Sequence, residues 1–276
     1  MMEKFKRNER IGAIIKVLAD HPNQVITYNY FSQLLAAAKS SISEDVSVVK
    51  KTIEELKMGK VETVSGAAGG VKYIPVLDDR DREQFIDEMC TMLQDQNRII
   101  SGGYLYYTDI IYSSQYVDKI GKIIAGDYIY KDIDYVVTME TKGIPIAMMT
   151  ARYLNRPLVI VRRGNKVTDG ATVSINYISG TSSTVRTISL PKRSLKDGSK
   201  VIIVDDFMKG GGTALGIINL LKEFNTIVEG ISVLIASEAP QNKLIKDYEP
   251  LMILKNLNSN SEAIEIVPYK KGDTVL

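Results

Sequence analysis

The stretch Val201–Thr213, VIIVDDFMKGGGT, decides the fold of the larger part of this chain. Its four leading aliphatic residues predict a strand buried on both faces, as in a parallel sheet. Asp205 and Asp206 follow, and a glycine-rich loop leads into a helix predicted over Thr213–Phe224. Backbone N–H groups at a helix start can hold a phosphate, and paired carboxylates can accept hydrogen bonds from ribose hydroxyls. The stretch therefore predicts a sugar-phosphate site, with a metal-binding carboxylate pair as the alternative.

Strands alternate with helices around this stretch, from about residue 100 onward. Strands are predicted at Asp134–Thr138, Leu158–Val161 and Ile227–Ala236, and a helix at Gly143–Leu154. Such alternation is typical of the α/β class with a mostly parallel sheet and right-handed crossovers. Ligands of these sheets bind at the carboxyl ends of the strands, where the segment Thr138–Gly143 also falls.

Residues 1–76 predict a separate domain, followed by a second domain over residues 77–276. Three helices are predicted, at Arg10–Ala19, at Tyr28–Ala38 with Thr27 as its cap, and from Ser41 or Ser43 to about Gly59. The apolar stripe of the third helix is Ile42, Val46, Val49, Ile53 and Leu56. Strands at Val61–Val64 and Val71–Val76 complete a winged helix-turn-helix.

The third helix of that motif is expected to enter the major groove of DNA. Candidate DNA contacts on this helix and on the hairpin are Ser40, Ser43, Ser47, Lys50, Lys51, Lys60 and Lys72. Glu44 and Asp45 are expected to cap the helix and complement its dipole. Residues 1–76 hold 11 Lys/Arg against 8 Asp/Glu, and the rest hold 24 against 25, so DNA contact is permitted. The alternative is a helical dimerisation or regulatory domain with solvated lysines.

The composition indicates which other classes of protein and site can be excluded. The chain has 276 residues, of which 45% are hydrophobic and 25% charged, as in ordinary globular proteins. No apolar run approaches the roughly 18–20 residues of a membrane span, and no signal peptide is indicated, so we expect a cytoplasmic protein. Single copies of Cys90 and His21 exclude an intrachain disulfide, a cysteine metal cluster and a multi-histidine site. We expect no resident metal, and Cys90 is predicted to pack in a helix.

The stretch Val201–Thr213 resembles the phosphoribosyl pyrophosphate motif of type I phosphoribosyltransferases. Thr138–Gly143 is similar to the pyrophosphate loop of that family, Arg162–Leu195 to its mobile hairpin, and the tail from residue 238 to its variable hood. The hairpin arms are predicted at Thr172–Ser179 and Thr184–Leu190. The resemblance implies a ligand site made of Thr141, Lys142, Gly143, Asp205, Asp206, Phe207, Met208, Lys209, Gly210, Gly211, Gly212 and Thr213.

The whole chain is similar to the bacterial purine operon repressor family. The stretches that carry this resemblance are Ser40–Asp45, Gly66–Pro75, Asn165–Thr168 and Asp205–Lys209. It implies a homodimer that binds operators of purine synthesis genes and that phosphoribosyl pyrophosphate, accompanied by Mg²⁺, releases from DNA. It also implies a site without catalysis and without a required cofactor.

Lys209 stands where transferases commonly carry Asp, Ala or Thr, which favours a sensor over an enzyme. The alternative is an active purine phosphoribosyltransferase with an added N-terminal domain. Two anion pockets beside a ribose patch also suit guanosine tetraphosphate as a competing ligand. Its guanine is expected to stack near Phe207 and Tyr104. The apolar residues Ile110, Ile111, Tyr112 and Tyr116 are predicted to contribute to a dimer interface.

Overall fold

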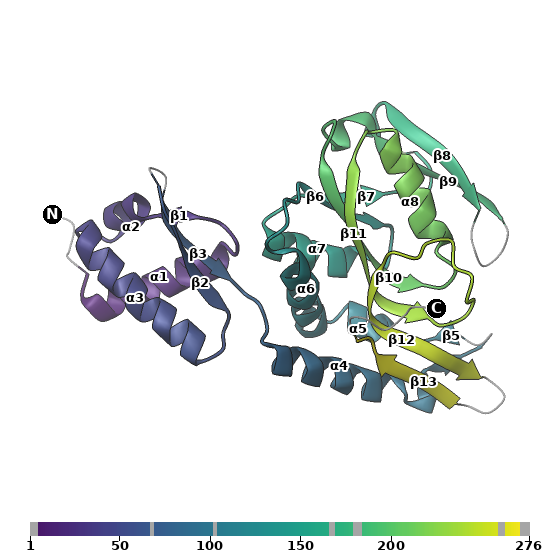
Figure 1. The fold of residues 1–276 in the computed structure, drawn as a ribbon, viewed down its shortest axis with the longest axis horizontal. Helices are drawn as coiled ribbons and strands as arrows, with labels where there is room; N and C mark the ends of the chain where they lie inside the picture. The colour runs from purple at the N-terminus through teal and green to yellow at the C-terminus, as the bar shows by residue number, and fades with distance from the viewer. Residues whose placement is uncertain are drawn as a thin grey trace.

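The computed structural model describes residues 5–66, 69–101, 104–165, 169–178, 184–258 and 263–270. Figure 1 shows two lobes, with a short connection from the smaller lobe into helix α4 (Asp79–Leu93) of the larger one. The smaller lobe holds three helices and a small sheet, and the larger lobe is built around a six-stranded sheet. The predicted fold class is confirmed.

The N-terminal lobe packs its helices and sheet around one apolar core. Its elements are α1 (Arg7–Asp20), β1 (Ile26–Thr27), α2 (Tyr28–Leu34), α3 (Lys39–Glu55), β2 (Lys60–Val64) and β3 (Gly70–Ile74). The strands pair antiparallel in the order β1-β3-β2. The core includes Ile14, Leu18, Phe31, Ile42 and Val49, each fully buried. This arrangement is a winged helix-turn-helix, with the β2–β3 hairpin as its wing.

Several helix boundaries differ from the predictions, and α1 begins at Arg7, three residues before the predicted Arg10. Helix α2 ends at Leu34, four residues early, and Ala36 adopts a left-handed φ of 46°. Helix α3 starts at Lys39 without a side-chain cap, so the predicted serine caps are wrong. The prediction that Leu56 belongs to the buried stripe is also wrong, because the helix ends at Glu55 and leaves Leu56 64% exposed. Thr27 is confirmed as the cap of α2, since its Oγ1 accepts from the Tyr30 N–H at 3.1 Å.

The C-terminal lobe has a sheet in the order β13-β12-β11-β10-β6-β7, parallel except for β13. The strands are β6 (Tyr135–Met139), β7 (Leu158–Val161), β10 (Lys200–Met208), β11 (Ile227–Ser237), β12 (Glu249–Asn258) and β13 (Ala263–Pro268). The remaining elements are η1 (Gln96–Arg98), β4 (Ile99–Ile100), β5 (Tyr104–Leu105), α5 (Thr108–Ile111), α6 (Ser114–Tyr128), α7 (Ile144–Leu154), β8 (Thr172–Ile178), β9 (Val185–Pro191), η3 (Lys192–Ser194) and α8 (Gly212–Lys222).

Both faces of this sheet are covered, which explains the unbroken aliphatic run in β10. Ile202 and Val204 belong to the core cluster that includes residues of α4, α6 and α7. Val201 and Ile203 belong to a second cluster with α8 and the β8–β9 hairpin. Successive strand residues face opposite ways, so a strand between two layers is apolar at every position. Helices α6 and α7 thus lie on one face, and α8 lies on the other (Figure 1).

The hairpin arms and the main strands are confirmed within one or two residues, except that β10 continues through both acids to Met208. Parts of several predicted segments lie outside the described residues: 67–68 in the wing, 102–103 beside Tyr104, 166–168 and 179–183 in the hairpin, and 259–262 and 271–276 in the tail. Pro75–Asp78 links β3 to α4, and the domain boundary near residue 76 stays a prediction.

The predicted dimer interface needs a correction. Ile110 and Ile111 are fully buried in the core of their own chain, so they cannot form an exposed apolar surface. Tyr116 packs partly against the same core, and Tyr112 is 58% exposed. Sequence periodicity does not reveal which apolar residues of a short helix such as α5 face the core.

Candidate functional site

The two carboxylates of β10 have different surroundings, although they are adjacent in the chain. Asp206 is buried, and its Oδ2 accepts a hydrogen bond of 2.6 Å from the Tyr107 hydroxyl. Burial, followed by the charge and the hydrogen bond of Asp206, raises the pKa of Tyr107 well above its usual range. The Tyr107 hydroxyl therefore keeps its proton and acts as a donor to Asp206.

Asp205 lies against the start of α7. A Cβ on Gly143 would come within 2.7 Å of Asp205 Oδ1 and 2.5 Å of Thr138 Oγ1, so a larger residue there would displace these side chains. Burial, and then the neighbouring Asp206 carboxylate, raises the pKa of Asp205 well above the usual 3.8. No lysine or arginine forms an ion pair with either acid within the described part of the chain. Asp206 Oδ2 accepts from Tyr107 and Asp205 Oδ1 accepts from the Asp206 N–H at 2.9 Å, and the remaining carboxyl oxygens can accept from a ligand.

The loop after β10 is the one predicted to hold a phosphate. Gly211 has a left-handed φ of 77° and caps α8, which begins at Gly212 and includes Thr213 in its first turn. The Gly210 carbonyl accepts from the Leu244 N–H at 3.0 Å, which fixes the loop against the tail. Lys209 is exposed at the edge of this loop, and Met208 is buried. Free N–H groups at such a helix start favour a phosphate.

The second loop predicted to hold an anion connects β6 to α7 and includes Thr141, Lys142 and Gly143. The peptide between Glu140 and Thr141 is cis, and Glu140 Oε1 accepts from the Arg163 N–H at 2.6 Å. Lys142 Nζ lies 4.7 Å from the centre of the Tyr107 ring. The loop and the β10 acids therefore meet at the same carboxyl edge of the sheet, as predicted.

An aromatic wall stands beside the acids. The rings of Tyr107 and Phe207 are stacked with centroids 6.2 Å apart. Tyr104, in β5, is 67% exposed and opposite Ile100 in a two-stranded sheet. The roles of Phe207 and Tyr104 beside a nucleobase stay predictions. Tyr107 itself was not predicted as a site residue, and only its place directly before α5 in the tyrosine-rich segment could have drawn attention to it.

The candidate DNA contacts on α3 share one exposed face. Ser40, Ser43 and Ser47 lie along it, and the Ser47 hydroxyl donates to the Ser43 carbonyl oxygen. Lys50 and Lys51 are each paired with a glutamate one turn on, at 3.9 Å (Glu54) and 3.7 Å (Glu55). Two of the three cations on the helix are thus balanced within the helix itself. Phosphate contacts from α3 stay a prediction.

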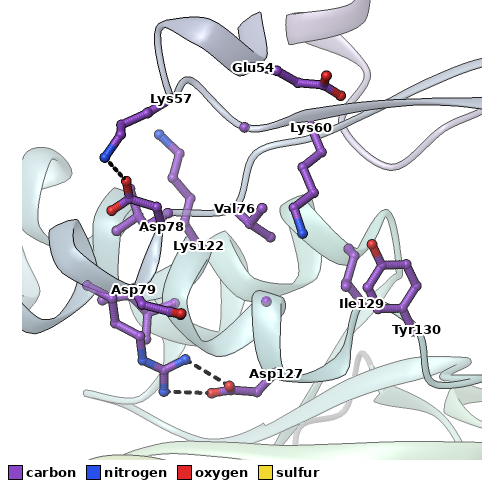
Figure 2. Close-up of a pocket in the computed structure, with 15 residues that line it drawn as sticks. Glu54, Lys57, Lys60, Val76, Asp78, Asp79, Lys122, Asp127, Ile129 and Tyr130 are labelled. Atoms are coloured by element: carbon purple, nitrogen blue, oxygen red, sulfur yellow. Dashed lines mark hydrogen bonds and ion pairs between the residues drawn. The ribbon is translucent and has the colours of Figure 1, made fainter. Parts of the chain in front are cut away.

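The two hairpin lysines do not lie at the tip of the wing. Lys72 pairs with Glu62 at 3.4 Å and is largely buried. Lys60, at the start of β2, lines a cavity of about 560 Å³ between the lobes. Figure 2 shows Lys60 and Lys122 projecting into this cavity, beside the Lys57–Asp78 ion pair. These positions weigh against groove contact by Lys60 in this arrangement of the lobes, and both DNA roles stay untested predictions.

Asp45 does not cap α3, contrary to the prediction. It is 1% exposed and accepts from Arg10 at 2.7 Å and from Arg7 at 3.3 Å, both on α1. Asp45 lies two turns into α3 on the side that faces α1, beside the buried Val46. The acid is therefore a buried ion-pair partner that ties α3 to α1.

The structure also bears on metal sites, membrane spans and a reactive cysteine. Across the described ranges, no group of three His, Cys, Asp or Glu residues is placed to hold a metal ion. Within them, no helix is both long and apolar enough to span a bilayer. Cys90 is confirmed as a packing residue of α4, and burial raises the pKa of its thiol to about 12.

Two family matches cover most of the chain. Residues 6–75 match the family described as "Bacterial purine repressor, N-terminal", and residues 108–271 match "Phosphoribosyl transferase domain". The adenine phosphoribosyltransferase of Thermoanaerobacter pseudethanolicus has a similar structure, with a TM-score of 0.52 and 21% identity over 60% of this chain and 98% of that one. This likeness concerns the fold alone. Fold and site thus define a class: a winged helix joined to a phosphoribosyltransferase-type lobe.

Full-length relatives narrow the class. The purine biosynthesis transcriptional repressor PurR of Bacillus subtilis is 47% identical over 95% of this chain and 92% of its own. The purine biosynthesis transcriptional activator PurR of Lactococcus lactis is 42% identical over 95% of this chain and 97% of its own. The chain belongs to the PurR family of purine biosynthesis transcriptional regulators.

Proposed function

We propose that this protein is a DNA-binding repressor of purine biosynthesis genes. The observation that carries the proposal is the identity to full-length PurR regulators, which extends across both lobes. Repression is favoured over activation because the repressor from Bacillus subtilis shares more residues with this chain than the activator from Lactococcus lactis does. The exposed serine face of α3 is the proposed base-reading surface, and a homodimer would double the contacts to an operator.

The proposed inducer is phosphoribosyl pyrophosphate. The glycine loop at the start of α8 suits its 5-phosphate, Asp205 and Asp206 suit its ribose hydroxyls, and Lys142 suits its pyrophosphate. Mg²⁺ would be held by the oxygens of the ligand itself, because this ion usually retains several water ligands and binds phosphate oxygens. Binding at this edge is proposed to weaken the hold of the N-terminal lobe on DNA.

Guanosine tetraphosphate is the proposed competing ligand. Its two phosphorylated ends match the two predicted anion loops, and its guanine would stack near Phe207 and Tyr104, of which Tyr104 is 67% exposed. Competition for one site would prevent the inducer from acting. Calorimetric titration of the tetraphosphate, with and without saturating phosphoribosyl pyrophosphate, tests this overlap. Equal affinity in both titrations would place the nucleotide elsewhere.

The same edge of the sheet supports a second candidate function, an active purine phosphoribosyltransferase. The sensor is favoured because an exposed Lys209 ammonium stands in the loop where a carboxylate near the base would serve catalysis. The test measures pyrophosphate release with phosphoribosyl pyrophosphate, Mg²⁺ and each purine base, beside gel shifts on operator DNA. Operator binding that phosphoribosyl pyrophosphate relieves, without base-dependent turnover, is the expected result. Turnover at enzyme-like rates would overturn the sensor.

A further inference from the structure

Three groups of the proposed ligand site converge on Tyr107. Its hydroxyl donates to Asp206 at 2.6 Å, its ring lies 4.7 Å from the ammonium of Lys142, and its other neighbour is the stacked ring of Phe207. Asp206 belongs to β10 and Lys142 to the loop between β6 and α7. Tyr107 comes from neither strand, because it directly precedes α5. One side chain therefore bridges the end of β10 and the loop between β6 and α7.

Each of these contacts restricts the position of a charged side chain, Asp206 in one case and Lys142 in the other. Asp206 makes no ion pair among the described residues, so the Tyr107 hydroxyl is its fixed hydrogen-bond donor. The ring face of a tyrosine attracts an ammonium, which restricts the otherwise flexible lysine to one region. Tyr107 is only 7% exposed, so packing holds its ring in place. A rigid buried ring is suited to orient charges before a ligand arrives.

We propose that Tyr107 is a positioning residue for both halves of the ligand site, its hydroxyl orienting Asp206 toward the sugar and its ring orienting Lys142 toward the pyrophosphate. This inference rests on the proposed function and deepens it. The two parts of the side chain have separable effects. Removing the hydroxyl should affect recognition of the sugar phosphate alone, and removing the ring should also affect recognition of pyrophosphate.

The test is calorimetry on the full chain in Mg²⁺ with three probes: ribose 5-phosphate, pyrophosphate and phosphoribosyl pyrophosphate. Tyr107→Phe is expected to lower the affinity for ribose 5-phosphate and for phosphoribosyl pyrophosphate about tenfold, because it removes a hydrogen bond to a charged group. The affinity for pyrophosphate should change by no more than about twofold. Tyr107→Leu should in addition weaken pyrophosphate about threefold, as expected for an exposed cation–π contact. In a Lys142→Met background, Tyr107→Leu should cause no further loss of pyrophosphate.

Tyr128→Phe is the matched control. Tyr128 is also buried, and its hydroxyl lies 3.0 Å from Ser232 Oγ, away from both anion loops. It should lower the thermal unfolding midpoint as Tyr107→Phe does and leave all three probes unaffected. If Tyr107→Phe weakens binding of ribose 5-phosphate and pyrophosphate equally, or binds every probe as the wild type does, the inference is wrong. The proposed function still stands in that case, provided that the wild-type chain binds phosphoribosyl pyrophosphate. A wild-type chain that binds none of the probes overturns both.

Discussion

Each lobe buries an aspartate, and the two lobes treat it in opposite ways. In the N-terminal lobe, Asp45 is 1% exposed and is neutralised by Arg7 and Arg10. In the C-terminal lobe, Asp205 and Asp206 share one strand end without an ion-pair partner among the described residues. A buried carboxylate that is paired contributes to packing, whereas adjacent unpaired carboxylates keep their hydrogen-bonding capacity for something else.

The difference gives a practical criterion for this molecule. Mutating the paired acid should cost stability, and mutating the unpaired acids should cost ligand response. The four experiments that follow test this separation in order of expected effect.

The largest effect is expected from Asp205→Ala combined with Asp206→Ala. Two charge-assisted hydrogen bonds to the ribose would be lost, which weakens binding of phosphoribosyl pyrophosphate about a thousandfold. Operator affinity in the absence of the inducer should stay unchanged, because the proposed DNA contacts belong to the other lobe. Gel shifts with and without the inducer measure both. A double variant that still responds to the inducer contradicts the ligand role of these acids.

The second effect concerns Asp45→Ala. It leaves Arg10, 13% exposed, without its partner, and we expect a loss of about 3 kcal/mol in the free energy of unfolding. Urea unfolding followed by circular dichroism measures the change. Asp20→Ala is the control, because Asp20 pairs with Lys16 on the surface of the same lobe. Equal stability of the two variants would refute the structural role of Asp45.

The third effect concerns Lys50→Ala combined with Lys51→Ala. The variant leaves Glu54 and Glu55 without their lysines on the proposed DNA face, so operator affinity should fall by roughly tenfold. If both lysines contact phosphate, the salt dependence of binding should lose about two units of slope, for all DNA sequences alike. Lys16→Ala, which breaks a similar pair on α1, serves as the control. Unchanged operator binding by the double variant removes this helix face from the account.

The smallest effect is a pH dependence of stability. Because the pKa of Asp205 is raised in the folded chain, the folded chain binds a proton more tightly than the unfolded chain. Protonation of Asp205 therefore stabilises the fold increasingly as the pH falls toward 3.8, the pKa of the same group in the unfolded chain. Asp205→Asn should flatten that trend in urea midpoints measured from neutral pH downward. Asp20, whose pKa is lowered by its hydrogen bond from Lys16, contributes with the opposite sign. A profile that Asp205→Asn leaves unchanged would show that the carboxyl is not protonated in this range.

Much of the fold could be predicted because buried strands and helix faces have characteristic apolar patterns in the sequence. The apolar run of β10 and the alternating strands and helices around it identify the sheet, and the glycines after Met208 identify the anion loop. The stripe of Ile42, Val46, Val49 and Ile53 identifies α3. Helix α6 also has a regular apolar stripe, including Val117, Ile120 and Ile124, and was not predicted although the signal is present.

The rest depends on contacts between distant residues. Asp45 appears to be a helix-start acid until α1 is placed beside it, since Arg10 is 35 positions away. Tyr107 and Asp206 are 99 positions apart, and no local pattern links them. The orientation of Ile110 and Ile111 depends on a four-residue helix, too short for periodicity to distinguish its faces. The positions of the two loops at the carboxyl edge of the sheet were predictable, and the contact that Tyr107 makes from outside the motif was not.

The contacts between the lobes have a mechanical consequence. Lys57 pairs with Asp78 at 2.6 Å, Tyr130 donates to Glu62 at 2.8 Å, and the Asn23 amide donates at 3.0 Å to the carbonyl of Leu154, the last residue of α7. Three separate contacts fix the orientation of one domain relative to another, whereas a single linker leaves it free to rotate. The DNA-binding lobe is mounted in this way, and one of its supports stands on the helix that begins at the Lys142 loop. Each of these three supports is a single polar contact, which contributes little by itself, whereas the fully buried Ile74 of β3 anchors the lobe in the apolar core of the larger one.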